Sequence, residues 1–201
     1  MTRRSEWPEH AGHEDGGGPA ASRAGAGPPH PPRSPEERAR AICLRLLTGT
    51  PRTRRELADA LREREIPEEV SAAVLDRFEE VGLIDDAAFA AAWVESRHHG
   101  RGLARRALAR ELRTKGVATA SIDEAIGGLD AEREEETARA LVERRLRATR
   151  GLDRDRRMRR LVGMLARKGY PEGTALRVVR EALAAEGEQL DEDTEPWHGG
   201  R

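Results

Sequence analysis

The sequence has one cysteine, Cys43, and only six aromatic residues: three tryptophans, two phenylalanines and a tyrosine. A single cysteine cannot form an internal disulfide, which favours a reducing compartment. No stretch approaches the roughly 18 consecutive apolar residues of a membrane-spanning helix. The N-terminal segment also lacks the apolar core of a secretory signal. We therefore expect a soluble, cytoplasmic protein with no membrane contact.

Motifs for catalysis or cofactor binding are missing as well, since there is neither a P-loop nor a GxGxxG run. The adjacent His98 and His99 would point about 100° apart on a helix, so they cannot bind one metal ion as an i, i+4 pair does. Their place beside Gly100 and Gly102 predicts a frayed helix end. Cys43, in "RAICLRLL", lies on an apolar helical face typical of a core. We predict no catalytic, cofactor-binding or metal-binding residue, and hence no enzyme.

The two ends of the chain differ in composition from the middle. Residues 1–34 include "GGGPAASRAGAGPPHPPRSP", which cannot bury apolar surface, and we expect a disordered tail there. Residues 186–201 carry one arginine against six acidic residues and are expected to form an acidic disordered tail. Between these ends, apolar residues recur at spacings of three and four, without the alternation of strands. The sequence therefore predicts an all-α protein.

The helical region repeats itself. When the sequence is shifted by 51 and then by 53 residues, apolar positions align three times. Each copy reads as a helix, an apolar residue five positions after its last core leucine, and a second helix. The aligned sets are Leu57, Leu61, Ile66, Leu75 and Phe78; Leu108, Leu112, Val117, Ile126 and Leu129; and Leu161, Leu165, Tyr170, Val179 and Ala182.

Residues that begin and end helices recur at matching places. Gly116 and Gly169 stand where a helix needs a left-handed C-cap, and Glu65 is the exception at that position. Pro67 and Pro171 suit the first turn of a helix, where a missing amide hydrogen costs nothing. The matching positions of these helix-ending glycines and helix-starting prolines support the alignment of the three copies.

A further helix is expected before each pair, at about 36–48, 86–98 and 131–149, with Asp85 and Asp130 as N-caps of the last two. Each unit is too small to be stable alone, and stacked neighbours supply the missing burial. We expect three tandem three-helix repeats forming an elongated, curved helical array. The predicted boundaries are 35–84, 85–129 and 130–185.

Basic residues are unevenly distributed although the formal net charge is only −1. Residues 131–185 carry 15 Lys/Arg against 9 Asp/Glu. On the helix expected at 103–115, Leu108 and Leu112 define the buried side, so Arg106, Arg110 and Arg113 fall together on the opposite face. A second basic row in the third repeat comprises Arg144, Arg147, Arg156, Arg160 and Arg167.

A cationic surface of this kind attracts polyanions, because Lys and Arg neutralise phosphates. Proteins that bind single-stranded nucleic acid usually combine such basic residues with exposed aromatic side chains, on which the bases stack. Here Phe78, Phe89, Trp93 and Tyr170 all fit buried positions of the repeats. An acidic protein surface, or a protein coated on nucleic acid, therefore fits better than bare bases. The alternative is that these arginines lie on solvated helix faces and bind no partner.

Two sequence segments, "GLIDDAAFAAAWVESR" and "ARRALARELRTKGV", resemble the RecX family of RecA regulators, and "LARKGYP" repeats the second signature in the last unit. The resemblance spans about residues 36–185. The residues that carry it are Gly82, Leu83, Asp85, Asp86, Phe89, Ala90, Trp93, Val94, Arg97, Glu111, Leu112, Lys115 and Gly116.

The resemblance implies a non-enzymatic modulator that binds the RecA filament on single-stranded DNA, lies along its groove, and restrains filament growth, ATP hydrolysis and strand exchange in recombination, repair and the SOS response. We expect a monomer that needs no cofactor. The rival is a general DNA-binding helical protein that acts without RecA, and a weak direct contact with nucleic acid stays open. The expected contact residues are Arg97, Arg106, Arg110, Arg113, Lys115, Arg144, Arg147, Arg156, Arg160 and Arg167.

Overall fold

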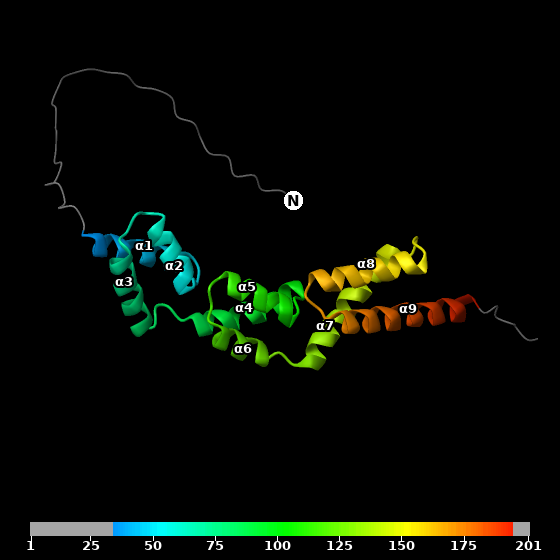
Figure 1. The fold of residues 1–201 in the computed structure, drawn as a ribbon. Coiled ribbons are helices and arrows are strands. Elements are labelled where there is room, and N and C mark those ends of the chain that lie inside the picture. Colours follow the sequence, from blue (N-terminus) through cyan, green and yellow to red (C-terminus); the bar gives the residue numbers. More distant parts are fainter. Residues whose placement is uncertain (1–33, 195–201) are drawn as a thin grey trace, which may run out of the picture. The chain divides into compact units, whose positions relative to one another are not determined.

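A computed structural model describes residues 34–194, with side chains described as far as Gly187. This part of the chain is helical and contains no strand, so the all-α prediction is confirmed (Figure 1). Its helices group into three repeats in chain order. Repeat 1 consists of α1 (Pro35–Gly49), α2 (Arg54–Arg62) and α3 (Glu68–Glu80). Repeat 2 consists of α4 (Asp86–Arg101), α5 (Arg105–Thr114) and α6 (Thr119–Gly127). Repeat 3 consists of α7 (Ala131–Leu146), the short 3₁₀ helix η1 (Arg147–Thr149), α8 (Arg154–Arg167) and α9 (Glu172–Thr194).

Each repeat has its own apolar core, built from the positions that the sequence alignment brings together. The first aligned leucines, Leu57, Leu108 and Leu161, are all buried, one in each core. Because the three helices of a repeat pack around these leucines, the threefold alignment is confirmed. One residue links two cores: Ala104, at the start of α5 in repeat 2, is fully buried within the core of repeat 3.

Side-chain caps begin most of the helices. Asp85 and Asp130 accept hydrogen bonds from the first turns of α4 and α7, as predicted. Thr53 forms a capping box with Glu56 at the start of α2. The prediction for the prolines is wrong by one position, since α3 begins at Glu68 and α9 at Glu172, each directly after its proline. A proline fits there because the residue before a helix also has no helical amide bond to lose.

Both glycines predicted to be left-handed lie where consecutive repeats touch. Gly116 and Gly169 have φ angles of 81° and 91°. A β-carbon on Gly169 would lie 2.6 Å from the backbone nitrogen of Ala107, and one on Gly116 would overlap the side chain of Arg55. The matching residue of repeat 1, Glu65, also has a positive φ of 57°. Glycine is dispensable there because, within the described chain, no earlier repeat packs against that turn.

Repeats 1 and 2 meet at what we call the first joint. The hydroxyl of Thr53 donates to the carbonyl of Lys115 at 2.7 Å, and the amide of Arg54 donates to the carboxylate of Asp86 at 2.9 Å. The start of α2 is therefore fixed to the end of α5 and to the start of α4. Both bonds bridge segments that are distant in the sequence.

Repeats 2 and 3 meet in the same way at the second joint. Ala104, which aligns with Thr53, donates its amide to the carbonyl of Lys168 at 2.9 Å. Arg105, which aligns with Arg54, donates its amide to the carboxylate of Glu134 at 2.9 Å. The two joints thus share one arrangement. In each, the start of the middle helix of one repeat meets the end of the middle helix of the next repeat.

The C-terminal end of the fold differs from the predicted boundary at residue 185. Helix α9 continues to Thr194, so the prediction of a disordered acidic tail from 186 is wrong over this stretch. At the start of this stretch, Glu186 is only 5% exposed and forms ion pairs with Arg150, at 2.7 Å, and with Arg157. Burial alone raises the pKa of Glu186, but the hydrogen bonds and charges of both arginines outweigh it and leave the pKa lowered. The predicted tails at 1–33 and 195–201 lie outside the described residues.

Replacing Gly169 tests the backbone contact at the second joint. Gly169→Ala should destabilise the protein more than Gly82→Ala, because both residues have positive φ angles but only Gly169 faces backbone where its β-carbon would be. The Gly82 substitution should cost about 1 kcal/mol, the ordinary penalty of this conformation, and the Gly169 substitution at least about twice that. Urea unfolding monitored by circular dichroism measures both, and equal losses would contradict the contact.

Glu186 gives the fold a dependence on pH. Glu186→Gln should lower the free energy of unfolding by about 2 kcal/mol at neutral pH, because Arg157 loses a buried charged partner. Since the folded pKa of Glu186 is lowered, its stabilisation is complete above the ordinary glutamate pKa of 4.5 and is lost as the pH falls through the folded value. The difference between wild type and variant, measured by denaturation, should therefore shrink in acid. A difference that stays constant from pH 7 to pH 3 would refute this role.

Candidate partner-binding surface

Three of the predicted contact residues are arginines on one exposed face of α5. Arg106, Arg110 and Arg113 are exposed on the side opposite Leu108 and Leu112, whose side chains are fully buried. None of the three arginines forms an ion pair with the part of the chain that the structure describes. We call this face the α5 stripe. Its charges are open to a partner, as the helical spacing predicts.

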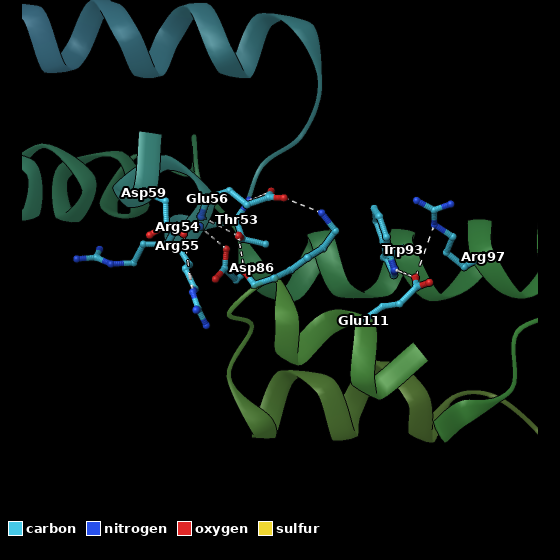
Figure 2. Close-up of polar contacts among 10 residues, drawn as sticks. Thr53, Arg54, Arg55, Glu56, Asp59, Asp86, Trp93, Arg97 and Glu111 are labelled. Atoms are coloured by element: carbon cyan, nitrogen blue, oxygen red, sulfur yellow. Dashed lines mark hydrogen bonds and ion pairs between the residues drawn. The ribbon is translucent and has the colours of Figure 1, made fainter. Parts of the chain in front are cut away.

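Arg97 and Lys115, also predicted as contacts, are engaged within the protein. Figure 2 shows Arg97 beside Trp93 and Glu111. The ammonium of Lys115 lies 2.6 Å from the carboxylate of Glu56 and 4.4 Å from the ring centroid of Trp93. The guanidinium of Arg97 stacks over the same ring at 4.1 Å. Trp93 in turn donates its indole hydrogen to Glu111 at 2.8 Å. Trp93, Arg97, Glu111 and Lys115 therefore form one cluster, and its cations position the aromatic ring.

An apolar groove of about 580 Å³ runs beside this cluster at the first joint. Its apolar lining comes from the end of α1, the turn before α4 and the outer face of α4: Leu47, Leu83, Phe89 and Trp93. Leu83 is 48% exposed, and Phe89 and Trp93 stack with ring centroids 5.5 Å apart. Polar residues at the margin include Arg52, Glu56, Asp85 and Lys115.

The prediction that Phe89 and Trp93 are buried is therefore wrong, because both are half-buried in this groove. Helix α4 fills the core of repeat 2 with Ala90 and Val94, which lie one position further along each turn. Its apolar face is wider than the core can cover. Helical spacing marks such a face but does not say how much of it a neighbour occupies. The aromatic pair is left facing the groove.

Ion pairs surround the polar side of the first joint. The guanidinium of Arg54 binds Asp76 and Glu79, each at 2.6 Å, while its amide binds Asp86. Burial raises the pKa of Asp86, and the hydrogen bond from the Arg54 amide opposes that rise. This network fixes the N-terminus of α4, which carries the aromatic pair. Sequence analysis missed it because its members are far apart in the chain.

The predicted basic residues of repeat 3 are all exposed, and some of them contact neighbouring groups of the protein. Arg156 pairs with Asp153 at 3.2 Å, and Arg144 donates to a carbonyl of its own helix. Arg160 and Arg167 line a hollow of about 190 Å³ together with Arg145, which the sequence analysis did not single out. Arg147 is exposed on η1.

His98 and Cys43, which the sequence analysis considered as metal-binding and catalytic candidates, both have structural roles. His98 is 2% exposed, so the prediction of a frayed helix end is wrong. Its Nδ1 lies 3.0 Å from the carbonyl of Leu103 and its Nε2 3.1 Å from the hydroxyl of Thr137, which ties α4 to α7. Cys43 is fully buried, as predicted, and burial raises its pKa to about 11. Such a thiol is held in its unreactive, protonated form.

In the part of the chain that the structure describes, no group of three or more His, Cys, Asp or Glu side chains gathers as metal ligands would. None of the helices in this range is both long enough and apolar enough to cross a membrane.

Comparison with known proteins matches each repeat to a family model. These are RecX, first three-helix domain, at residues 39–78; RecX, second three-helix domain, at 85–126; and RecX, third three-helix domain, at 132–179. The chain is similar to "Regulatory protein RecX" of Streptomyces lividans, with 75% identity over 89% of this chain and 94% of the relative. The protein of the same name from Mycobacterium avium is 53% identical over 78% of this chain and 91% of the relative.

Solved structures agree with the sequence relatives. The chain is similar to a crystal structure of regulatory protein RecX, with 26% identity, a TM-score of 0.64, and coverage of 70% of this chain and 69% of that one. The crystal structure of RecX from Lactobacillus salivarius, at 18% identity, shares the fold with a TM-score of 0.67 over 73% of this chain and 96% of that one. With three matched domains and close relatives along most of its length, this chain belongs to the RecX family.

Proposed function

We propose that this protein is a non-enzymatic regulator that binds the RecA filament on single-stranded DNA and restrains its ATP hydrolysis, extension and strand exchange. The observation that carries the proposal is the match of all three repeats to RecX domains, together with close relatives named as regulatory proteins. Recombination, DNA repair and the SOS response in the cytoplasm are the processes in which such a regulator acts.

The two joints support a clamping mechanism. Each joint fixes consecutive repeats through hydrogen bonds between backbone and buried groups, such as Thr53 to Lys115 and Ala104 to Lys168. Repeats held in this way act as several linked binding modules, which span neighbouring protomers of a filament. A bound regulator that prefers one arrangement of the protomers shifts the filament towards it. The rearrangements needed for turnover and extension then become less favourable.

The α5 stripe and the apolar groove supply complementary parts of a protein interface. Interfaces combine buried aromatic or aliphatic anchors with charged residues at the rim. Leu83, Phe89 and Trp93 provide half-exposed apolar surface. Arg106, Arg110 and Arg113 provide charge that attracts an acidic surface and speeds association. Arg97 and Lys115 contribute by holding Trp93 in place.

The alternative function is that of a general DNA-binding protein that acts without RecA. The observation in its favour is the set of exposed arginines in repeat 3. Salt-sensitive binding to duplex DNA, with no effect on RecA, would identify that activity.

Charge reversal of the α5 stripe tests the proposed contact. The variant Arg106→Glu/Arg110→Glu/Arg113→Glu should lose inhibition of RecA ATPase on single-stranded DNA, because the stripe would repel the acidic surface that it normally attracts. ATP hydrolysis is measured while the protein is titrated against RecA. Inhibition well below one protein per RecA indicates capping, whereas a one-to-one requirement indicates coating.

The matched control reverses three other exposed arginines, Arg38, Arg77 and Arg180, and so changes the net charge equally. This control should inhibit as the wild type does, and circular dichroism should show equal helicity in all three proteins. Full inhibition by the stripe variant would rule out the stripe as the contact.

A separate substitution tests the groove. Leu83→Ser should weaken RecA inhibition about fivefold, because the half-exposed leucine would lose roughly 1 kcal/mol of apolar burial on binding. Leu44→Ser is the control, since Leu44 is 49% exposed and does not line the groove. Half-maximal inhibitory concentrations compare the two variants. An equal effect of both would show that general loss of apolar surface, and not the groove, is responsible.

A further inference from the structure

The first helices of the three repeats can be aligned through the residues that they bury. Each helix contributes two buried residues, one turn apart, to the core of its own repeat: Ala39 and Cys43 in α1, Ala90 and Val94 in α4, and Ala138 and Val142 in α7. In this alignment the groove residues Phe89 and Trp93 of α4 correspond to Thr137 and Leu141 of α7. The surroundings of these positions can therefore be compared between the two joints.

At the second joint these positions meet the preceding repeat. The hydroxyl of Thr137 lies 3.1 Å from Nε2 of the buried His98, which corresponds to Leu47 in the same alignment. Leu141 packs so closely on Gly102 that a β-carbon on the glycine would lie 2.8 Å from it. The arrangement of helices at a joint therefore permits the outer side chains to touch across it.

At the first joint the corresponding residues line an open groove instead. Leu47, Phe89 and Trp93 border a space of about 580 Å³, to which the 48% exposed Leu83 adds further apolar surface. Apolar surface left in water weakens the folded state, and contiguous patches of it mark sites of interaction. Because the second joint shows that side chains at these positions can meet, the open apolar lining indicates a surface that a ligand covers.

Four charged residues belong to the lining, and three of them are engaged within the protein. One carboxylate oxygen of Glu56 lies 2.6 Å from the ammonium of Lys115, and the other accepts the amide of Thr53 at 3.2 Å. Asp85 accepts the amide of Ala88 at 2.8 Å, at the helix N-terminus where the dipole stabilises negative charge. Both acidic residues of the groove are therefore compensated locally.

Arg52, the fourth charged residue, has no such compensation. It is half-buried in the segment before α2, and no carboxylate in residues 34–187 forms an ion pair with it. Its Nε is buried and has no hydrogen-bond partner among these residues. A guanidinium binds a carboxylate through two parallel hydrogen bonds, which would supply both the missing partner and the missing negative charge. The groove thus combines an apolar lining with one cation that lacks a counter-ion.

The aromatic residues of the groove are poorly suited to stacking of nucleic acid bases. The Trp93 ring already has Arg97 at 4.1 Å and Lys115 at 4.4 Å from its centroid, and it stacks on Phe89 at 5.5 Å. Single-strand binding relies on free ring faces and on several cations along a groove. An apolar side chain with a carboxylate nearby matches this lining better, and proteins provide that combination.

We propose that the groove at the first joint binds a short segment of the protein partner in which a leucine or aromatic side chain lies within a few residues of a carboxylate. The apolar side chain covers Leu83 and Trp93, and the carboxylate binds Arg52. Arg52 then selects acidic segments and rejects basic ones. The inference rests on the proposed function in taking the partner to be RecA. Because both repeats line the groove, the bound segment contacts both of them.

Cross-linking from the groove tests this inference with the full-length protein. Ser96 is exposed and lines the groove, whereas Cys43 is fully buried, so a benzophenone maleimide attaches to the variant Ser96→Cys at the new thiol alone. The labelled protein is irradiated with RecA assembled on single-stranded DNA. Mass spectrometry should identify a cross-linked RecA segment that has leucine or an aromatic residue within a few positions of Asp or Glu.

Charge variants in the same labelled protein test the role of Arg52. Arg52→Glu should lower the yield of the RecA cross-link at least tenfold, because it repels the carboxylate, and the neutral Arg52→Gln should lower it about fivefold. The control Arg38→Glu reverses an exposed arginine of α1 outside the groove and should keep the full yield. Circular dichroism should show equal helicity in all of these proteins.

The groove assignment is overturned if the cross-linked RecA segment has no carboxylate, if the label reacts only with DNA or with a copy of this chain, or if Arg52→Glu and Arg38→Glu give equal yields. Inhibition of RecA ATPase by the labelled protein without any RecA cross-link would also exclude the groove as the contact, while the proposed function would stand. A wild-type protein that does not inhibit RecA would contradict the proposed function itself.

Discussion

The structure depends on a close contact between the start of the middle helix of one repeat and the end of the middle helix of the next. At each joint, a lysine carbonyl at the end of a middle helix accepts a hydrogen bond from the preceding repeat. The glycine that follows, Gly116 or Gly169, turns the chain with a positive φ angle and leaves room for that repeat. A side chain there would separate the repeats. The three small cores can pack against one another because neither glycine carries a side chain at the contact.

The two joints share this backbone geometry, yet their side chains have diverged. The first joint neutralises its lysine and exposes aromatic and aliphatic surface beside it. The second joint has alanine in place of the acidic Glu56, and the Lys168 ammonium donates to the carbonyl of Arg101. In a tandem repeat each unit contacts only its neighbours, so the side chains around a shared arrangement of helices can differ from one joint to the next. Differences between equivalent positions are thus a better guide to function here than the conserved geometry.

The sequence predicts the fold well because its strongest signals are local. Leucines four residues apart, such as Leu57 and Leu61, fix the buried face of a helix, and glycine after a helix indicates a left-handed turn. The exposure of the α5 stripe follows from the same spacing. These features need no knowledge of which repeat lies beside which.

The features that sequence reasoning missed depend on partners far along the chain. Thr53 and Lys115 are 62 residues apart, and His98 is buried because Thr137 and Leu103 satisfy its ring. Glu186 belongs to an acidic segment that resembles a tail, and only its arginine partners make it part of the core. The half-exposure of Trp93 likewise depends on what its neighbours leave uncovered. Composition and spacing carry no information about such contacts.

The ends of the repeat series have a consequence for its length. Glu65 occupies the turn where an earlier repeat would need glycine. At the other end, Arg157 aligns with Thr53 and Ala104, and its guanidinium is tied to Glu186 and Thr149. Within the described chain, neither of these two positions can form a joint of the kind that couples the three repeats. A duplicated unit would therefore need a different residue at position 65 or 157 before it could join the others in the same way.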